Sequence, residues 1–358
     1  MPFRVETVLL APGAEQYAGA TQGSFSVASI VADARRAEAA GFDGVTVPEG
    51  GHDPFLPLVL AAEHTRRVTL GTNVAIAFPR SPMVVAQLAW DLQRLSGGRF
   101  SLGLGTQSRA HVERRYAAEW KDPAGPRLRD YVQCLRAMWA SFQRGGKPEA
   151  FAGEHYRFDL LPSFSNPGPN EHPHVPIYLG ILNVYGARLA GELADGIRLH
   201  PIATFRYARE IVRPAVAEGA RRAGRDARAV DLVAAPFLAT ARDAEGVAKA
   251  KSAVKRQIAF YATNRGYQAV LAHHGWGELA RDLTRLATEG RTAEMGDAIS
   301  DDMLDEWAIV ATWEGLAGAV RERLGGLFRS VLLELPPDLA REEQRVRDIV
   351  GALRRERD

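Results

Sequence analysis

The chain has 358 residues, a length that suits one α/β barrel better than one ordinary domain. Its 45 basic and 43 acidic residues leave a formal charge of +2, which gives no reason to expect a nucleic-acid or anionic-membrane partner. The single cysteine, Cys134, excludes an internal disulfide framework and a multi-cysteine metal or iron–sulfur site.

Strands and helices alternate through the first hundred residues. Apolar runs predict strands at 5–10, 42–47, 68–77 and 100–104. Helices are predicted between them at 26–40, at 57–65, and from Ser81-Pro82 to Gly97-Gly98. Nearly continuous apolar strands separated by helices are typical of a parallel sheet covered by helices. A Rossmann sheet and an α/β barrel both fit this half.

The second half continues the alternation with two excursions. Helices are predicted at 127–142, 185–193, 205–223 and 244–261, and strands at 175–180, 196–200, 230–239 and 330–335. The first excursion, at about 147–176, carries a short hairpin near 151–158, and the second, at about 261–306, is helical and irregular. A total of eight strands favours a (β/α)8 TIM barrel. We expect one domain over 1–358.

Sequence motifs exclude several common enzyme classes. The chain has no His-Glu-x-x-His, Gly-x-Ser-x-Gly or Walker motif, so the sequence does not favour a metalloprotease, an α/β-hydrolase or a nucleoside triphosphatase. Gly103-Leu104-Gly105 is glycine-rich, but it lacks the complete dinucleotide fingerprint. Because barrel active sites lie where strands end, the candidate site residues are those that follow the predicted strands. We expect no metal site.

An ordered series of motifs resembles the bacterial luciferase-like flavin and deazaflavin oxidoreductases. The series covers roughly residues 4–335 and comprises AAGFDGV at 39–45, AAEHTRRVTLGT at 61–72, RSP at 80–82, SGGRFSLGLG at 96–105, PIYLG at 176–180 and ADG at 194–196. The resemblance implies an α/β barrel with a flavin-type ring at the strand ends. Members of this family use either reduced FMN for oxygenation or coenzyme F420, a deazaflavin, for hydride transfer.

The deazaflavin branch is the more similar one, on the segments at 48–49, 53–58, 77–83 and 89–93 and on Trp120. This resemblance implies a coenzyme F420-dependent oxidoreductase. It would transfer a hydride between the deazaflavin and a small organic substrate with an activated C=C, a C=N or an alcohol/carbonyl pair. The alternatives are an FMN-dependent luciferase-like monooxygenase with a separate flavin reductase, and a non-catalytic flavin-binding protein. A phosphate-binding isomerase barrel would require the resemblance to be wrong.

The resemblance also implies which residues bind the cofactor. Asn73 and Val74 match a bulge that supports the ring from behind, often through a non-proline cis peptide bond. Thr106 and Gln107 match positions that contact the ring or the ribityl chain, and His200 matches a polar strand-end position near the cofactor tail. A loop whose amides bind the cofactor phosphate corresponds to Gly180, Ile181, Leu182 and Asn183. Several relatives have paired glycines where this chain has Leu182 and Asn183.

Candidates for proton transfer are fewer. Some relatives have a catalytic histidine one residue after the acid that ends the second strand, whereas this chain has Glu49-Gly50-Gly51-His52. Glu49 is therefore the first catalytic candidate. His111, which begins a helix ahead of two arginines, is the second, because it could bind an acidic substrate or a phosphate.

Partners and location follow from the same observations. The sequence has neither a signal peptide nor a run of about 18 apolar residues, so we expect a cytoplasmic protein without membrane contact. The only ligand expected besides the cofactor is a small-molecule substrate. The resemblance implies a homodimer or a higher homo-oligomer.

Overall fold

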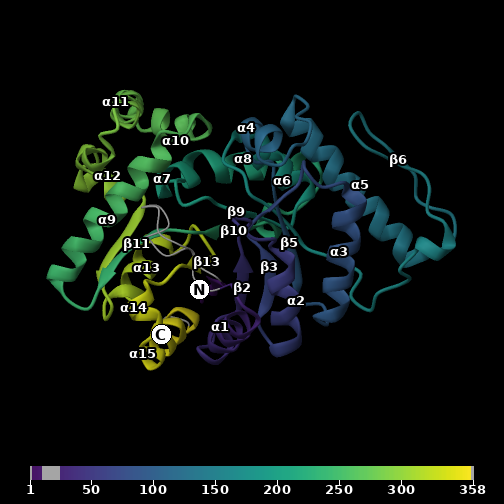
Figure 1. Ribbon diagram of the computed structural model, residues 1–358, viewed down its shortest axis with the longest axis horizontal. Helices are drawn as coiled ribbons and strands as arrows, with labels where there is room; N and C mark the ends of the chain where they lie inside the picture. The colour runs from purple at the N-terminus through teal and green to yellow at the C-terminus, as the bar shows by residue number, and fades with distance from the viewer. Residues whose placement is uncertain (1, 10–24, 356–358) are drawn as a thin grey trace.

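Eight parallel strands form a closed barrel in the computed structural model, which describes residues 2–9 and 25–355. The sheet runs in the order β3-β2-β1-β13-β10-β9-β8-β5 and closes where β3 pairs with β5 (Figure 1). The strands are β1 (Arg4–Val8), β2 (Gly44–Val47), β3 (Thr69–Thr72), β5 (Phe100–Gly105), β8 (Ile177–Leu179), β9 (Gly196–Arg198), β10 (Asp231–Ala234) and β13 (Ser330–Leu333). The predicted barrel is confirmed. Leu10, at the end of the first predicted strand, lies outside the described residues.

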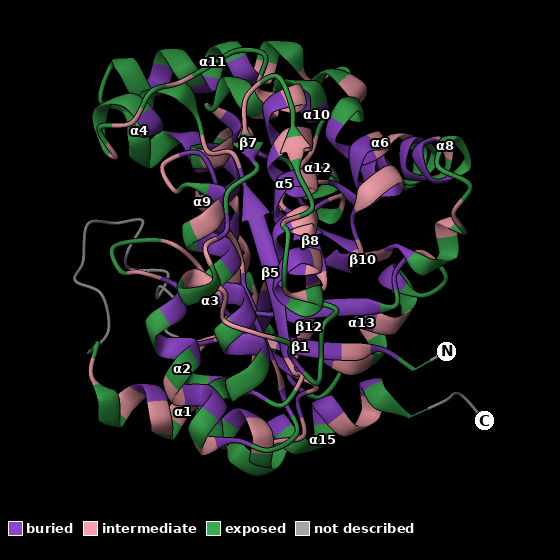
Figure 2. Ribbon diagram, turned by 90° about the vertical axis from the view of Figure 1, so that its right-hand side faces the viewer, coloured by how far each residue is buried: buried purple, intermediate pink, exposed green. Residues whose placement is uncertain are grey.

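Helices surround the barrel and expose their outer faces, whereas the strands inside are mostly buried (Figure 2). The longer ones are α1 (Val27–Ala39), α2 (Phe55–His64), α3 (Pro82–Leu95), α5 (Ala124–Arg144), α6 (Val184–Leu193), α8 (Arg213–Arg222), α13 (Leu316–Leu324) and α15 (Glu343–Arg354). Short helices α4 (Arg109–Arg114), α7 (Phe205–Tyr207) and α14 (Pro337–Ala340) complete the ring, with a π-helical turn at Ala208–Val212. Ser81 caps α3 ahead of Pro82, as the sequence predicts.

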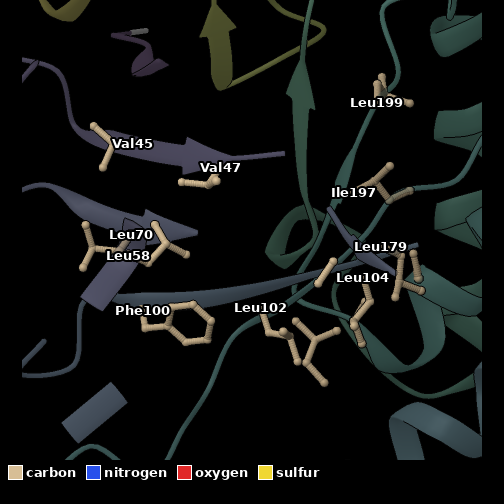
Figure 3. Packing of buried hydrophobic residues seen from close by; sticks show 14 of the residues in the cluster. Val45, Val47, Leu58, Leu70, Phe100, Leu102, Leu104, Leu179, Ile197 and Leu199 are labelled. Carbon is tan, nitrogen blue, oxygen red and sulfur yellow. The ribbon is translucent and has the colours of Figure 1, made fainter. Parts of the chain in front are cut away.

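Side chains alternate along each barrel strand between the helices and the barrel interior. Leu102, Leu104, Leu179 and Ile197 belong to the large core formed by the strands and the helices (Figure 3). The residues that alternate with these along each strand face the barrel interior, because successive side chains of a strand point in opposite directions. The barrel interior includes the apolar cluster of Tyr178, Val233 and Leu332.

Two parts of the fold differ from the prediction. The single strand predicted at 230–239 is β10 followed by β11 (Phe237–Ala241), interrupted at Pro236, which has no N–H for a strand hydrogen bond. β11 pairs in parallel with β12 (Ala308–Thr312), a strand that the sequence analysis missed. The strand predicted at 68–77 is likewise interrupted at Asn73 and Val74, after which β4 (Ala75–Ile76) pairs with β5.

The two excursions have their own structure. In the first, β6 (Phe151–Ala152) and β7 (Arg157–Phe158) form the predicted antiparallel hairpin, followed by a 3-10 turn at Ser163–Ser165. The second follows α9 (Ala244–Ala262) and includes α10 (Gln268–His273), α11 (Gly277–Thr288) and α12 (Asp301–Asp305), on one side of the barrel (Figure 1). It packs its own apolar core around Ile258, Leu283 and Trp307. Among the described helices, none is both long enough and apolar enough to span a bilayer.

Candidate active site

The predicted site residues follow strands that all end at one mouth of the barrel. Because the eight strands are parallel, their carboxyl ends meet there. By the strand order of the sheet, β3, β5, β8 and β9 form one half of this mouth, and β2, β1, β13 and β10 form the other. The predicted cofactor residues lie on the first half, and Glu49 follows β2 on the second.

A bulge at Asn73 and Val74 separates β3 from β4, and the peptide bond between these residues is cis. Val74 packs over three glycines of neighbouring strands. A Cβ atom at Gly105 would lie 2.6 Å from a Val74 methyl group, and one at Gly180 would lie 3.1 Å from both methyl groups. At Gly103, a Cβ atom would lie 2.0 Å from the carbonyl oxygen of Thr72. The glycines within β5 and after β8 therefore make room for the bulge, which explains the isolated Gly-x-Gly at 103–105.

The loop after β8 leads into the N-terminus of α6. Asn183 caps this helix by accepting a hydrogen bond from the Gly186 N–H at 2.7 Å. The Leu182 carbonyl accepts one from the Tyr207 hydroxyl at 3.1 Å. Within residues 25–355, no acceptor is found for the backbone N–H groups of residues 181–185. These N–H groups, beside an exposed helix start, remain available to an external anion.

His200 follows β9 and is surrounded by aromatic rings. Its centroid lies 4.7 Å from that of Tyr261 and 4.8 Å from that of Tyr267. The Ile202 N–H donates to Nδ1 at 3.1 Å, so the neutral ring carries its proton on Nε2. Burial lowers the pKa of His200 to about 4. The imidazole is therefore neutral at pH 7 and can donate a hydrogen bond.

This low pKa predicts a specific loss of stability in acid. Between about pH 6.5 and pH 4 the unfolded chain binds a proton at His200 that the folded protein does not, so stability falls as the pH falls. We expect the melting temperature of His200→Gln to decrease less over this range than that of the wild type. The exposed His111→Gln variant is the control. An equal decrease of the melting temperature in wild type and His200→Gln over this pH range would contradict the prediction.

Glu49 belongs to a hydrogen-bond network that connects three loops. Its side chain is only 4% exposed. Arg80 donates to both carboxylate oxygens at 2.9 and 2.7 Å, the Ile76 N–H donates at 2.7 Å, and the Tyr116 hydroxyl donates at 2.8 Å. Arg80 also pairs with Asp53 at 3.0 Å. Both oxygens of Glu49 are thus occupied by donors from the protein itself, and its catalytic role stays a prediction.

Tyr116 and Arg80 are members of this network that the sequence analysis did not select. Burial and the hydrogen bond to Glu49 raise the pKa of Tyr116 to about 12, so its hydroxyl remains a donor. The neighbouring Arg115 donates to the Gly50 carbonyl. The end of α4 therefore reaches the loop after β2 through residues 115 and 116.

The structure does not connect the other candidates to this network. His111 is exposed on α4, and its carbonyl accepts hydrogen bonds from the N–H groups of Arg115 and Tyr116. Thr106 donates to the carbonyl of Gln107, whose φ of 60° turns the chain after β5. The roles predicted for these three residues are untested. Within residues 2–9 and 25–355, no cluster of three or more His, Cys, Asp or Glu could hold a metal ion.

A cavity of about 640 Å³ begins at the second half of the mouth and continues along α1 and α15 as far as Phe42, which precedes β2. The described part of its wall comes from the ends of β1, β2 and β13 and from α1, α14 and α15. Most of this wall is apolar, and Glu334, directly after β13, lies in it. The sequence analysis missed Glu334, although it is the one charged residue in the otherwise apolar stretch at 331–337.

Comparison with known proteins identifies the family. The luciferase-like monooxygenase family profile matches residues 5–330. An uncharacterized protein of Mycobacterium tuberculosis is 43% identical over 305 residues, 84% of this chain and 89% of that protein. A putative coenzyme F420-dependent oxidoreductase of the same species is 31% identical over 292 residues, 76% of this chain and 81% of that protein. The solved coenzyme F420-dependent tetrahydromethanopterin reductase from Methanopyrus kandleri shares the fold, with a TM-score of 0.77, 20% identity and 99% coverage of both chains. The chain therefore belongs to the luciferase-like monooxygenase family and is an oxidoreductase of the luciferase-like type.

Proposed function

We propose that this protein is a coenzyme F420-dependent oxidoreductase that transfers a hydride between the deazaflavin and a small organic substrate. The observation that carries the proposal is the run of unpaired N–H groups at residues 181–185, which suits the phosphate of a flavin-type cofactor. The 31% identical relative, a putative coenzyme F420-dependent oxidoreductase, supports F420 over FMN.

The residues at the first half of the mouth fit such a cofactor. The N–H groups of residues 181–185 would bind the phosphate, and His200 would donate a hydrogen bond from Nε2. Val74, seated on glycines, would support the ring from behind. These groups are neutral donors and apolar surface, so they suit an uncharged ring and an anionic tail.

The protein's own part in the reaction is to orient the reactants and to exclude water. When bound, coenzyme F420 supplies a hydride donor or acceptor that reacts poorly with oxygen. The strand order places the predicted cofactor half of the mouth next to the cavity at the ends of β1, β2 and β13. A substrate bound where the cavity meets the mouth would lie beside the ring, which is the positioning that hydride transfer needs.

A binding titration tests the choice of cofactor. We expect oxidised F420 to bind the purified protein at micromolar concentration or below, measured by the quenching of its fluorescence, and FMN to bind more weakly. Micromolar FMN binding without a response to F420 would instead support the FMN-dependent monooxygenase. No binding of either compound would contradict both functions.

A substitution at Asn183 tests whether the loop after β8 binds the cofactor phosphate. Asp and Asn cap helices about equally well, so Asn183→Asp should leave the melting temperature almost unchanged. Its carboxylate would repel the cofactor phosphate, and we expect F420 affinity to fall by about 10-fold or more. Asn183→Ser keeps a capping oxygen without the charge and is the control. Equal F420 affinity for Asn183→Asp and wild type would place the phosphate elsewhere.

A further inference from the structure

Glu334 is a carboxyl group in the wall of a mainly apolar cavity. It is two residues after Leu332, which faces the barrel interior, and strand alternation directs it toward the mouth. Among residues 2–9 and 25–355, no side chain forms an ion pair or a hydrogen bond with it. The residue is exposed to solvent within the cavity, whose wall it helps to form. Desolvation by the protein around the cavity raises the pKa of Glu334 to about 7.

The other charged groups of the cavity wall are engaged elsewhere or lie at its rim. On α1, Arg36 pairs with Asp33, and on α15, Arg347 pairs with Glu343 at 2.9 Å. His52, on the loop after β2, stacks on Phe25 with a centroid distance of 3.7 Å. The exposed Arg35 and Arg341 complete the charged wall, and neither forms an ion pair with Glu334. Desolvation alone accounts for the raised pKa of Glu334.

We propose that Glu334 is the acid–base residue of this cavity, and that the cavity takes a mainly apolar substrate whose carbonyl oxygen faces this carboxyl group. The inference rests on the proposed function and adds the proton donor and the substrate class. The volume of about 640 Å³ suits a small organic molecule. Glu49 is less suited to the task because Arg80, Tyr116 and Ile76 already occupy its oxygens.

The proposed reaction is the reduction of a carbonyl compound or an enone, in which the substrate gains one hydride and one proton. A hydride, delivered from the reduced flavin-type cofactor, forms a C–H bond at the carbonyl carbon, or at the β-carbon of an enone. In a carbonyl substrate the C=O π bond breaks, and the oxygen takes the proton of the Glu334 carboxyl group. In an enone the C=C bond shifts to the carbonyl carbon as the C=O π bond breaks, and the oxygen takes the same proton to give the enol. The resulting carboxylate regains a proton from water through the open cavity. In the reverse direction, the carboxylate accepts the alcohol proton as the hydride leaves.

Two measurements on the full chain without cofactor test the inference. Infrared titration should show a protonated carboxyl C=O band that disappears near pH 7 in the wild type and is absent from Glu334→Gln. Cyclohexenone, a small apolar enone, is the binding probe, followed by ligand-observed NMR. We expect the wild type to bind it about 2- to 10-fold more tightly at pH 6 than at pH 8, because only the protonated carboxyl group can donate to the carbonyl oxygen.

Controls separate this result from a general effect of charge or of folding. Glu334→Gln should bind cyclohexenone with the same affinity at both pH values, whereas Glu322→Gln, exposed on α13, should retain both wild-type signals. Wild-type binding that does not depend on pH, or an infrared band that persists in Glu334→Gln, would overturn the inference. Both measurements need no cofactor, so their outcome is independent of whether F420 binds.

Discussion

Replacing Arg198 by methionine is expected to lower the free energy of unfolding by about 3–5 kcal/mol. The Arg198 guanidinium lies inside the barrel, 2.6 Å from the Glu6 carboxylate, with 3% and 1% of the two side chains exposed. Arg4 is a second partner of Glu6 at 2.9 Å, and Tyr178 packs its ring against the guanidinium at 4.9 Å. Without Arg198, the buried carboxylate loses its closest countercharge. Urea unfolding of wild type and variant measures the difference.

A double variant shows whether the unpaired charge is the cause. Glu6→Gln combined with Arg198→Met removes both charges and should recover part of the lost stability. Although burial alone would raise it, Arg198 and Arg4 hold the pKa of Glu6 below its ordinary value. The wild type should therefore lose this contribution as the pH falls through the lowered pKa. If Arg198→Met unfolds at the same urea concentration as the wild type, the pair contributes no stability.

Gly103→Ala is expected to lower the free energy of unfolding by about 1–3 kcal/mol and to weaken cofactor binding. The new Cβ atom would lie 2.0 Å from the Thr72 carbonyl oxygen, so β3 and β5 would have to separate. This separation would also disturb the hydrogen bonds between the Thr72 hydroxyl and Gly103, at 2.7 and 2.9 Å. As a result, Val74 would no longer pack closely against the three glycines. Urea unfolding and F420 titration measure the two effects.

The control for this variant is a glycine with open surroundings. Gly318 lies on the exposed side of α13, and a Cβ atom there would meet nothing within 4 Å. Gly318→Ala should therefore stabilise the protein by about 0.5–1 kcal/mol, because alanine favours the helix. Wild-type stability and cofactor affinity in Gly103→Ala would mean that the bulge does not depend on the close approach of β3 and β5.

Much of the barrel was predictable because its strands are buried on both faces. Such strands appear in the sequence as short apolar runs between helix signals, and all eight were found this way. β12 was missed because its pairing with β11 is not local and its apolar run follows an irregular helical stretch. Pro236 was the available signal that the strand predicted at 230–239 would be interrupted.

The candidate site was predictable only in part. The resemblance identified Asn73-Val74, the loop at 180–183 and His200, all of which follow barrel strands. It did not identify Arg80 or Tyr116 as the partners that occupy Glu49, since these residues are far from it in sequence. Glu334 was also missed, because a single glutamate at a strand end does not by itself indicate a cavity.

The sequence by itself determined the fold class, the family and the strand ends where a site must lie, because strand periodicity and ordered motifs are local features of the chain. Only the tertiary structure decided what surrounds each residue there. It placed Val74 on three glycines and left the N–H groups of residues 181–185 without an acceptor among residues 2–9 and 25–355. It also put Glu334 in the wall of a mainly apolar cavity. Burial and pairing depend on segments distant in sequence, and they set the pKa values of His200 and Glu334.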